Sequence, residues 1–163
     1  MRTRLEHHLA SRQVAHVIYG SVIGLALDLA VQNHPPGAVA MIGWVLGTAV
    51  AVALADIYSE VLGTEIRQRG RMTRQQWTDV SEDGAAVAFG AGFSAVFFLL
   101  AGLGIVTLAT AFTLAKWCGL GLISFYGYWA GRFAGATVAR ALLQAAVVAL
   151  IGSALIALKA FLH

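Results

Sequence analysis

The stretch "AVAMIGWVLGTAVAVALADIYSEVL", residues 38–62, decides the fold class because it is long, apolar and uninterrupted. Its first charged side chain is Asp56, so the preceding 18 residues carry no charge. A helix of about 20 such residues crosses the ~30 Å hydrocarbon core of a bilayer. The run lacks the alternation of a membrane barrel strand, and a lipid-exposed backbone must satisfy its own hydrogen bonds. We therefore expect a transmembrane helix here.

The composition extends this expectation to the whole chain of 163 residues. Hydrophobic residues make up 59% of it and charged residues 12%, whereas a soluble domain has about 25% charged residues. The formal net charge of +3 would also fit a nucleic-acid-binding protein. The basic residues, however, fall in short blocks between apolar runs, which is a signal of membrane topology. We expect an integral membrane protein whose partner is the lipid bilayer, with no nucleic acid.

Five membrane spans are predicted from the apolar runs and the breaks between them. The breaks include the turn "QNHPPGA", a polar linker over 63–83 and the sequence "AGLG" at 101–104. The expected spans cover residues about 14–31, 38–62, 84–102, 105–131 and 138–161. They form one all-α transmembrane domain over 14–162, preceded by a tail over 1–13. The acids of "SED", residues 81–83, are expected to cap the start of the third span.

The arginines orient this bundle. They lie in the tail, in the linker and just before the last span, whereas the two turns on the opposite side carry no Lys or Arg. Basic segments stay in the cytoplasm, so the N-terminus is predicted inside and the C-terminus outside. The expected location is the inner (plasma) membrane, as a multi-pass protein.

Small residues recur at four-residue spacing in three of the predicted spans. The pairs are Gly20 and Gly24, Gly43 and Gly47, and Gly127 and Gly131. Such pairs let helix backbones approach closely. They predict packing within the chain or, alternatively, contacts in a homo-oligomer. A dimer is favoured, because five helices of this size leave little interior for a pathway.

Polar side chains inside the spans are the candidate functional residues, since a carboxylate near the bilayer centre costs on the order of 2.5–3.5 kcal/mol. Asp56 and Glu60, at positions i and i+4, share one helical face. Like charges this close favour a neutral form, so one of them could bind a proton reversibly. With His16 they could instead hold a divalent metal ion. Another alternative is that Glu60 pairs with Arg67 or Arg140 at the membrane surface.

Asp28 is a further candidate ion-binding residue, placed in the outer half of the first span. Lys116 lies deep in the fourth predicted span, and an ion pair between Asp28 and Lys116 would lower the free-energy cost of placing both charges in the membrane. Three other polar residues are expected to support the Asp56 site from the cytoplasmic half: Tyr19, Tyr58 and Gln144.

The expected function is movement of a small cation, either a proton or a divalent metal, by a homo-oligomer. Asp56 is the principal binding group, and a bound divalent cation is the one cofactor that the residues allow for. The alternative is a non-transporting scaffold or assembly subunit of a larger complex, whose acids lock helices together. An enzyme is not expected, because the sequence has no hydrolase elbow, nucleotide loop or zinc motif. Cys118, the single cysteine, is expected to be a small core residue.

Two resemblances accompany these predictions. The segments "HVIYG" at 16–20, "YSEVLG" at 58–63 and "ALKAFLH" at 157–163 resemble a group of small, uncharacterised bacterial integral membrane proteins, which implies no activity. The five-span plan, with Asp28 and the "ADIYSE" of 55–60, is similar to the vacuolar iron transporter family. Members of that family exchange divalent iron or manganese for protons as dimers. The linker here is basic where that family has acidic metal-binding helices, so this resemblance implies the fold more than the substrate.

Overall fold

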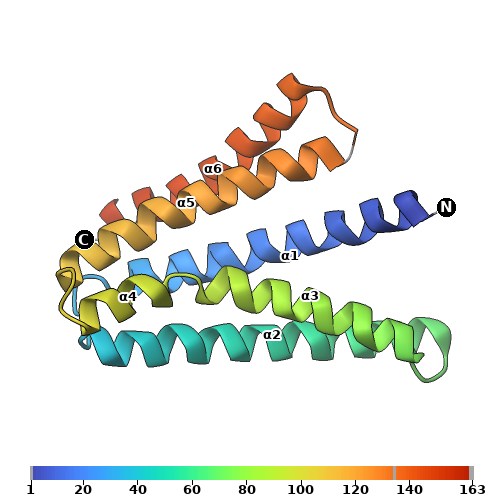
Figure 1. The fold of residues 1–163 in the computed structure, drawn as a ribbon, viewed down its shortest axis with the longest axis horizontal. Coiled ribbons are helices and arrows are strands. Elements are labelled where there is room, and N and C mark those ends of the chain that lie inside the picture. The colour runs from blue at the N-terminus through green and yellow to red at the C-terminus, as the bar shows by residue number, and fades with distance from the viewer. Residues whose placement is uncertain (1, 134, 162–163) are drawn as a thin grey trace.

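The computed structural model describes residues 2–133 and 135–161, which form helices joined by short turns (Figure 1). The described part of the chain contains no strand, which confirms the predicted all-α class. The six helices are α1 (Arg2–Val31), α2 (Ala38–Gln68), α3 (Arg74–Gly92), α4 (Ala95–Gly102), α5 (Leu108–Phe133) and α6 (Val138–Phe161).

The helices lie along one long axis and run back and forth between its two ends (Figure 1). The start of α1, the α2–α3 turn and the α5–α6 turn gather at one end, which we call the tail end. The α1–α2 turn, the α4–α5 turn and the end of α6 gather at the other, which we call the far end. α1 packs against α3 and α5, α2 covers α3, and α6 packs mainly on α5.

Three of these helices are long and apolar enough to cross a membrane, which is the make-up of a helical membrane protein. They are α2, the Gln13–Val31 part of α1 and the Leu108–Arg132 part of α5. α3 and α4 pass the same test as a pair, bent by 45°, and add a fourth span if the pair counts as one. α6 has a shorter apolar stretch, Val138–Ala154. The count of five spans and their orientation remain predictions.

The predicted linker over 63–83 is mostly helical. α2 continues to Gln68, and α3 begins at Arg74, so only residues 69–73 form the turn. Thr73 caps α3: its hydroxyl accepts from the Gln76 N–H at 3.3 Å, and the Gln76 side chain accepts from the Thr73 N–H at 2.8 Å. The expected cap at 81–83 is therefore wrong, because Asp83 lies more than two turns inside α3.

The closest approach in the bundle is between α1 and α3. A Cβ atom added at Gly20 would overlap the carbonyl oxygen of Val87, and one at Gly24 would lie 2.6 Å from the carbonyl oxygen of Ala91. A Cβ atom at Gly90 of α3 would in turn overlap the carbonyl oxygen of Val17. These glycines therefore serve packing within the chain.

The other predicted glycine pairs lie in different surroundings. Cβ atoms added at Gly43 or Gly47 of α2 would meet nothing within 4 Å, so this pair faces away from the chain's own helices. Gly127 and Gly131 of α5 are buried.

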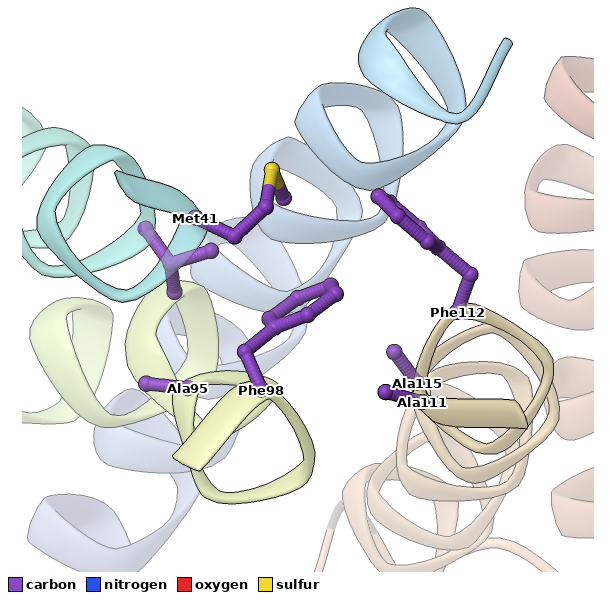
Figure 2. Close-up of a cluster of buried hydrophobic side chains, with 7 residues drawn as sticks. Met41, Ala95, Phe98, Ala111, Phe112 and Ala115 are labelled. Atoms are coloured by element: carbon purple, nitrogen blue, oxygen red, sulfur yellow. The ribbon is translucent and has the colours of Figure 1, made fainter. Parts of the chain in front are cut away.

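An apolar core joins α2, α4 and α5 near the far end (Figure 2). The rings of Phe98 on α4 and Phe112 on α5 meet edge to face, with centroids 4.8 Å apart, and Met41 of α2 is fully buried against them. Cys118, by contrast, is exposed, so the expectation that it belongs to the core is wrong for the single chain.

Candidate functional site

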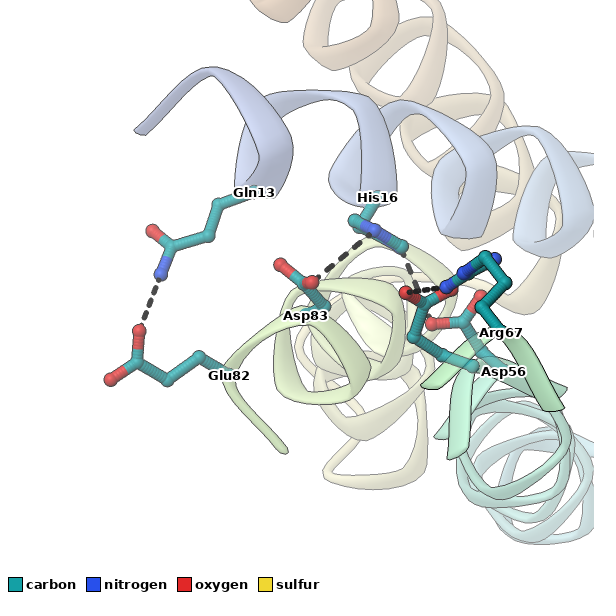
Figure 3. A network of polar contacts seen from close by, with 7 residues as sticks. Gln13, His16, Asp56, Arg67, Glu82 and Asp83 are labelled. Carbon is teal, nitrogen blue, oxygen red and sulfur yellow. Dashed lines mark hydrogen bonds and ion pairs between the residues drawn. The ribbon is translucent and has the colours of Figure 1, made fainter. Parts of the chain in front are cut away.

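Three polar side chains from three helices meet between α1, α2 and α3 (Figure 3). His16 projects from α1 between Asp56 of α2 and Asp83 of α3. Buried apolar residues flank the two acids, Ala53 one turn from Asp56 and Val87 one turn from Asp83. The packing of the three helices therefore brings the polar groups together. We call these three residues the His16 cluster.

The two ring nitrogens of His16 face different carboxylates. Nδ1 lies 3.3 Å from Oδ2 of Asp56, and Nε2 lies 3.7 Å from Oδ2 of Asp83. The Asp83 side chain is 6% exposed, whereas those of Asp56 and His16 are 21% and 25% exposed. Within the cluster, Asp83 is therefore buried, whereas His16 and Asp56 are partly accessible. At this depth, charges interact more strongly than they do in water.

This arrangement suits the exchange of a proton. A neutral imidazole carries one N–H and can donate to only one carboxylate, whereas an imidazolium carries two and can donate to both. In the structure the two contacts, at 3.3 and 3.7 Å, have ion-pair distances and are longer than a charge-assisted hydrogen bond. Gain or loss of one proton on the ring therefore changes whether His16 can donate to the carboxylate on α2, to the one on α3, or to both.

The same arrangement does not suit one metal ion. Because the two carboxylates lie at opposite nitrogens of the ring, no single ion position adjoins both of them and a ring nitrogen. Across residues 2–133 and 135–161, so far as they are described, no group of three or more His, Cys, Asp or Glu side chains could hold a metal ion. The predicted set of Asp56, Glu60 and His16 is not assembled.

Glu60 instead pairs with Arg67, one of the two partners that the sequence allowed. Nη2 of Arg67 lies 3.4 Å from Oε1 of Glu60 and donates to Oγ1 of Thr64 at 3.1 Å. The Glu60 side chain is 40% exposed and that of Arg67 is 65% exposed. This pair at the tail end is solvent-screened and contributes little to stability.

Asp83 was not among the residues predicted for the site. Its neighbours Ser81, Glu82 and Asp79 are polar, so the residue reads as part of a linker. Two signals could have found it. The capping box from Thr73 to Gln76 starts the helix early, and helical spacing then places Asp83 on the same face as the buried Val80 and Val87.

Of the predicted supporting residues, the two tyrosines are exposed. Tyr19 and Tyr58 are 50% and 66% exposed. The ammonium group of Lys116 lies 6.0 Å from the ring centroid of Trp117 on the same helix. The side chain of Gln144 is outside the part of the structure that is described.

Asp28 is buried in the far half of α1, with 3% of the residue exposed. The expected pair with Lys116 is not seen: within the described chain, neither carboxylate oxygen has a hydrogen-bond partner. Ser94, at the break between α3 and α4, is fully buried, and its hydroxyl lies close enough to interact with this carboxylate without hydrogen-bond geometry. Asp28 and Ser94 therefore form a second polar locus, apart from the His16 cluster.

Among the described residues, two hollows lie near the tail end, within about one helical turn of residues of the His16 cluster. A cavity of about 470 Å³ lies between α1, α3 and α5, where Gln13 donates a hydrogen bond to Glu82 at 3.0 Å. A smaller one of about 220 Å³ lies between α2 and α3 and is lined by Glu60, Arg67 and Asp79 among others. Both hollows are rimmed by carboxylates within about one turn of the cluster residues.

Comparison of the chain with protein-family models, with curated proteins and with solved structures finds no match in any of the three. The geometry of the residues is therefore the basis for a functional proposal.

Proposed function

We propose that this protein moves protons across a membrane and that the His16 cluster is the group that takes up and releases them. The observation that carries the proposal is the position of His16, with one ring nitrogen toward Asp56 and the other toward Asp83. Ionisable groups inside a membrane bundle are costly and typically mark proton or ion paths.

A proton is favoured over a divalent metal because of the spacing of the donors. A hard divalent cation needs several oxygens around one point, whereas the two carboxylates of the cluster lie at opposite edges of the imidazole ring. A proton needs only one donor and one acceptor. The metal is therefore the alternative cargo, and the experiment below includes it.

Access from the tail end supports the same proposal. His16 and Asp56 are partly exposed, and the carboxylates that line the two hollows, Glu60 and Asp79 in one and Glu82 in the other, lie within about one helical turn of Asp56 or Asp83. The positive-inside bias makes the tail end cytoplasmic. The cluster would then load from, or unload to, the cytoplasm, in an inner (plasma) membrane crossed by five spans.

A homo-oligomer, with a dimer favoured, completes the proposal. A Cβ atom added at Gly43 or Gly47 on the outward face of α2 would meet no atom of the described residues within 4 Å, which leaves this pair available for close contact with another copy. No catalytic activity is proposed.

A non-transporting scaffold is the second candidate, and one observation favours it. Some of the polar groups pair with one another, Glu60 with Arg67 and His16 with two acids. That is what residues that only lock helices together would do. Under this alternative the His16 cluster holds α1, α2 and α3 in register, and the exposed apolar faces receive lipid or partner subunits.

Flux measurements in proteoliposomes separate the two candidates. The full-length protein is reconstituted with an interior pH dye and, separately, a dye for divalent metals, and a pH or voltage gradient is applied. We expect proton flux in the wild type and a fall to the level of protein-free vesicles in Asp56→Asn and Asp83→Asn. Glu65→Gln, a carboxyl change on α2 outside the cluster, is the matched control and keeps the flux.

Each variant is first checked for helix content and monodispersity in detergent, so that lost flux is read only from folded protein. Metal flux without proton flux would replace the proton by the metal as cargo. Absence of both fluxes, together with reduced stability of Asp56→Asn and Asp83→Asn, would favour the scaffold.

A further inference from the structure

The second polar locus, Asp28 with Ser94, lies where the α3–α4 span is broken. α3 ends at Gly92 and α4 begins at Ala95, and the pair is bent by 45°. The backbone hydrogen bonds resume beyond the break with the Val96 N–H on the carbonyl of Phe93 and the Phe97 N–H on that of Ser94. The hydroxyl of Ser94 is thus placed inside the bundle by the break itself.

The end of α3 presents the negative end of its helix dipole to this locus. The last carbonyls of a helix lack intrahelical partners, and the C-terminus carries a partial negative charge. The carbonyl oxygen of Ala91 approaches α1 at Gly24, one turn before Asp28 on the same helix. The same break also holds the start of α4, whose first N–H groups carry a partial positive charge, so the dipoles of the two helices oppose each other at this carboxylate.

Burial makes an ionised carboxylate at Asp28 energetically costly. Both oxygens of Asp28 and the hydroxyl oxygen of Ser94 lack hydrogen-bond partners within the described chain, and 3% and 0% of the two residues are exposed. An isolated ionised carboxylate in such surroundings is neutralised by a proton or by a cation. A metal cation needs several oxygens at one point, whereas a proton converts Asp28 into a donor that can reach Ser94 or a free carbonyl.

We propose that Asp28 and Ser94, at the α3–α4 break, form a second proton-binding site, distinct from the His16 cluster. The carboxyl group holds the proton, and the Ser94 hydroxyl is its hydrogen-bond partner. Proton binding at this site stands without the proposed function. Its role in transport, as the proton-binding site nearer the far end, rests on the proposed function.

The two sites are separated by a tightly packed segment of α1. Asp28 is 12 residues beyond His16 on one helix, which is about 18 Å at 1.5 Å per residue. Gly20 and Gly24 lie between them in direct backbone contact with α3, and the Ser21 hydroxyl is already engaged with the Val17 carbonyl at 2.7 Å. The packing of α1 on α3 therefore separates the two sites in this structure.

Infrared spectroscopy of the full-length protein in lipid bilayers tests the site without any measurement of flux. At neutral pH we expect a carboxylic-acid C=O band in the wild type that disappears in Asp28→Asn and persists in the control Asp79→Asn. Ser94→Ala should keep the band and shift its frequency, because the hydrogen-bond partner of the carboxyl group is gone. This variant leaves Asp28 in place, so the test stands even if Asp28→Asn does not fold.

Three results would overturn the proposal. The first is the absence of an acid band that depends on Asp28, which would mean that the group is ionised. The second is an unshifted band in Ser94→Ala. The third is loss of the band when Na⁺ is added at constant pH, which would make the locus a cation site. Flux without the acid band would refute this site alone, whereas the acid band without flux would refute only the transport role.

Discussion

At the scale of single residues, three aspartates of this chain have the same side chain in three different settings. Asp56 is partly accessible and faces His16, Asp83 is nearly closed off beside the same ring, and Asp28 is buried without a partner. The surroundings of the three differ: the first two face the same imidazole ring, and the third has no hydrogen-bond partner among the described residues.

The cost of removing Asp83 is a prediction at this scale. Asp83→Ala takes away a nearly buried carboxylate that lies 3.7 Å from Nε2 of His16, so we expect a loss of about 1–3 kcal/mol in the free energy of unfolding. Glu82→Ala, next to it in the chain and exposed, should change that free energy by no more than about 0.5 kcal/mol. Thermal unfolding in a single detergent measures both. Equal effects of the two substitutions would show that the His16 cluster does not stabilise the bundle.

At the scale of elements, two features position the sites. The glycine-mediated contact holds α1 against α3, which fixes His16 opposite Asp83. The break between α3 and α4 bends the second half of that span, so that Ser94 enters the interior and Phe98 packs on Phe112. Both features belong to pairs of helices, and neither helix of a pair would produce them alone.

Glycine substitutions distinguish the packed pair from the outward-facing pair. Gly20→Ala and Gly90→Ala place a methyl group against a backbone carbonyl, so each should lower the free energy of unfolding by about 1–3 kcal/mol or more. Gly43→Ala meets no neighbouring atom and should be neutral or stabilising by up to about 1 kcal/mol, because alanine favours helix.

The measurement is thermal unfolding of each variant in one detergent, with the oligomeric state checked in parallel. If Gly43→Ala proved as destabilising as Gly20→Ala, the outward face of α2 would already be packed in the protein as isolated, as in a stable dimer.

At the scale of the whole molecule, the turns collect at two ends (Figure 1). The arginine-rich α2–α3 turn lies at the tail end, and the turns that carry no Lys or Arg lie at the far end. Such a division of charge between the two ends matches the bias of membrane proteins toward basic cytoplasmic segments. The two proton sites then lie nearer opposite surfaces of the membrane.

Labelling of single cysteines on intact cells tests this orientation. In a Cys118→Ser background, a membrane-impermeant maleimide should label His34→Cys and Gly104→Cys from outside, because both lie in turns at the far end. Gly70→Cys, in the α2–α3 turn, should react only after the cells are opened. Labelling of Gly104→Cys and Gly70→Cys from the same side would contradict the predicted topology and would mean that α3 and α4 do not cross the membrane.

The sequence alone determined the class of protein, since about 20 apolar residues in a row have one stable form in lipid, the helix. It also marked Asp56 and Asp28, because a carboxylate inside an apolar run stands out without any knowledge of its neighbours. Only the tertiary structure decided which side chains lie beside each carboxylate. Asp83 lies in the site because α3 begins at Arg74, capped by Thr73, and packs on α1. Glu60 pairs instead with Arg67 on its own helix. Partners depend on which helix faces meet, and hydropathy carries no information about that.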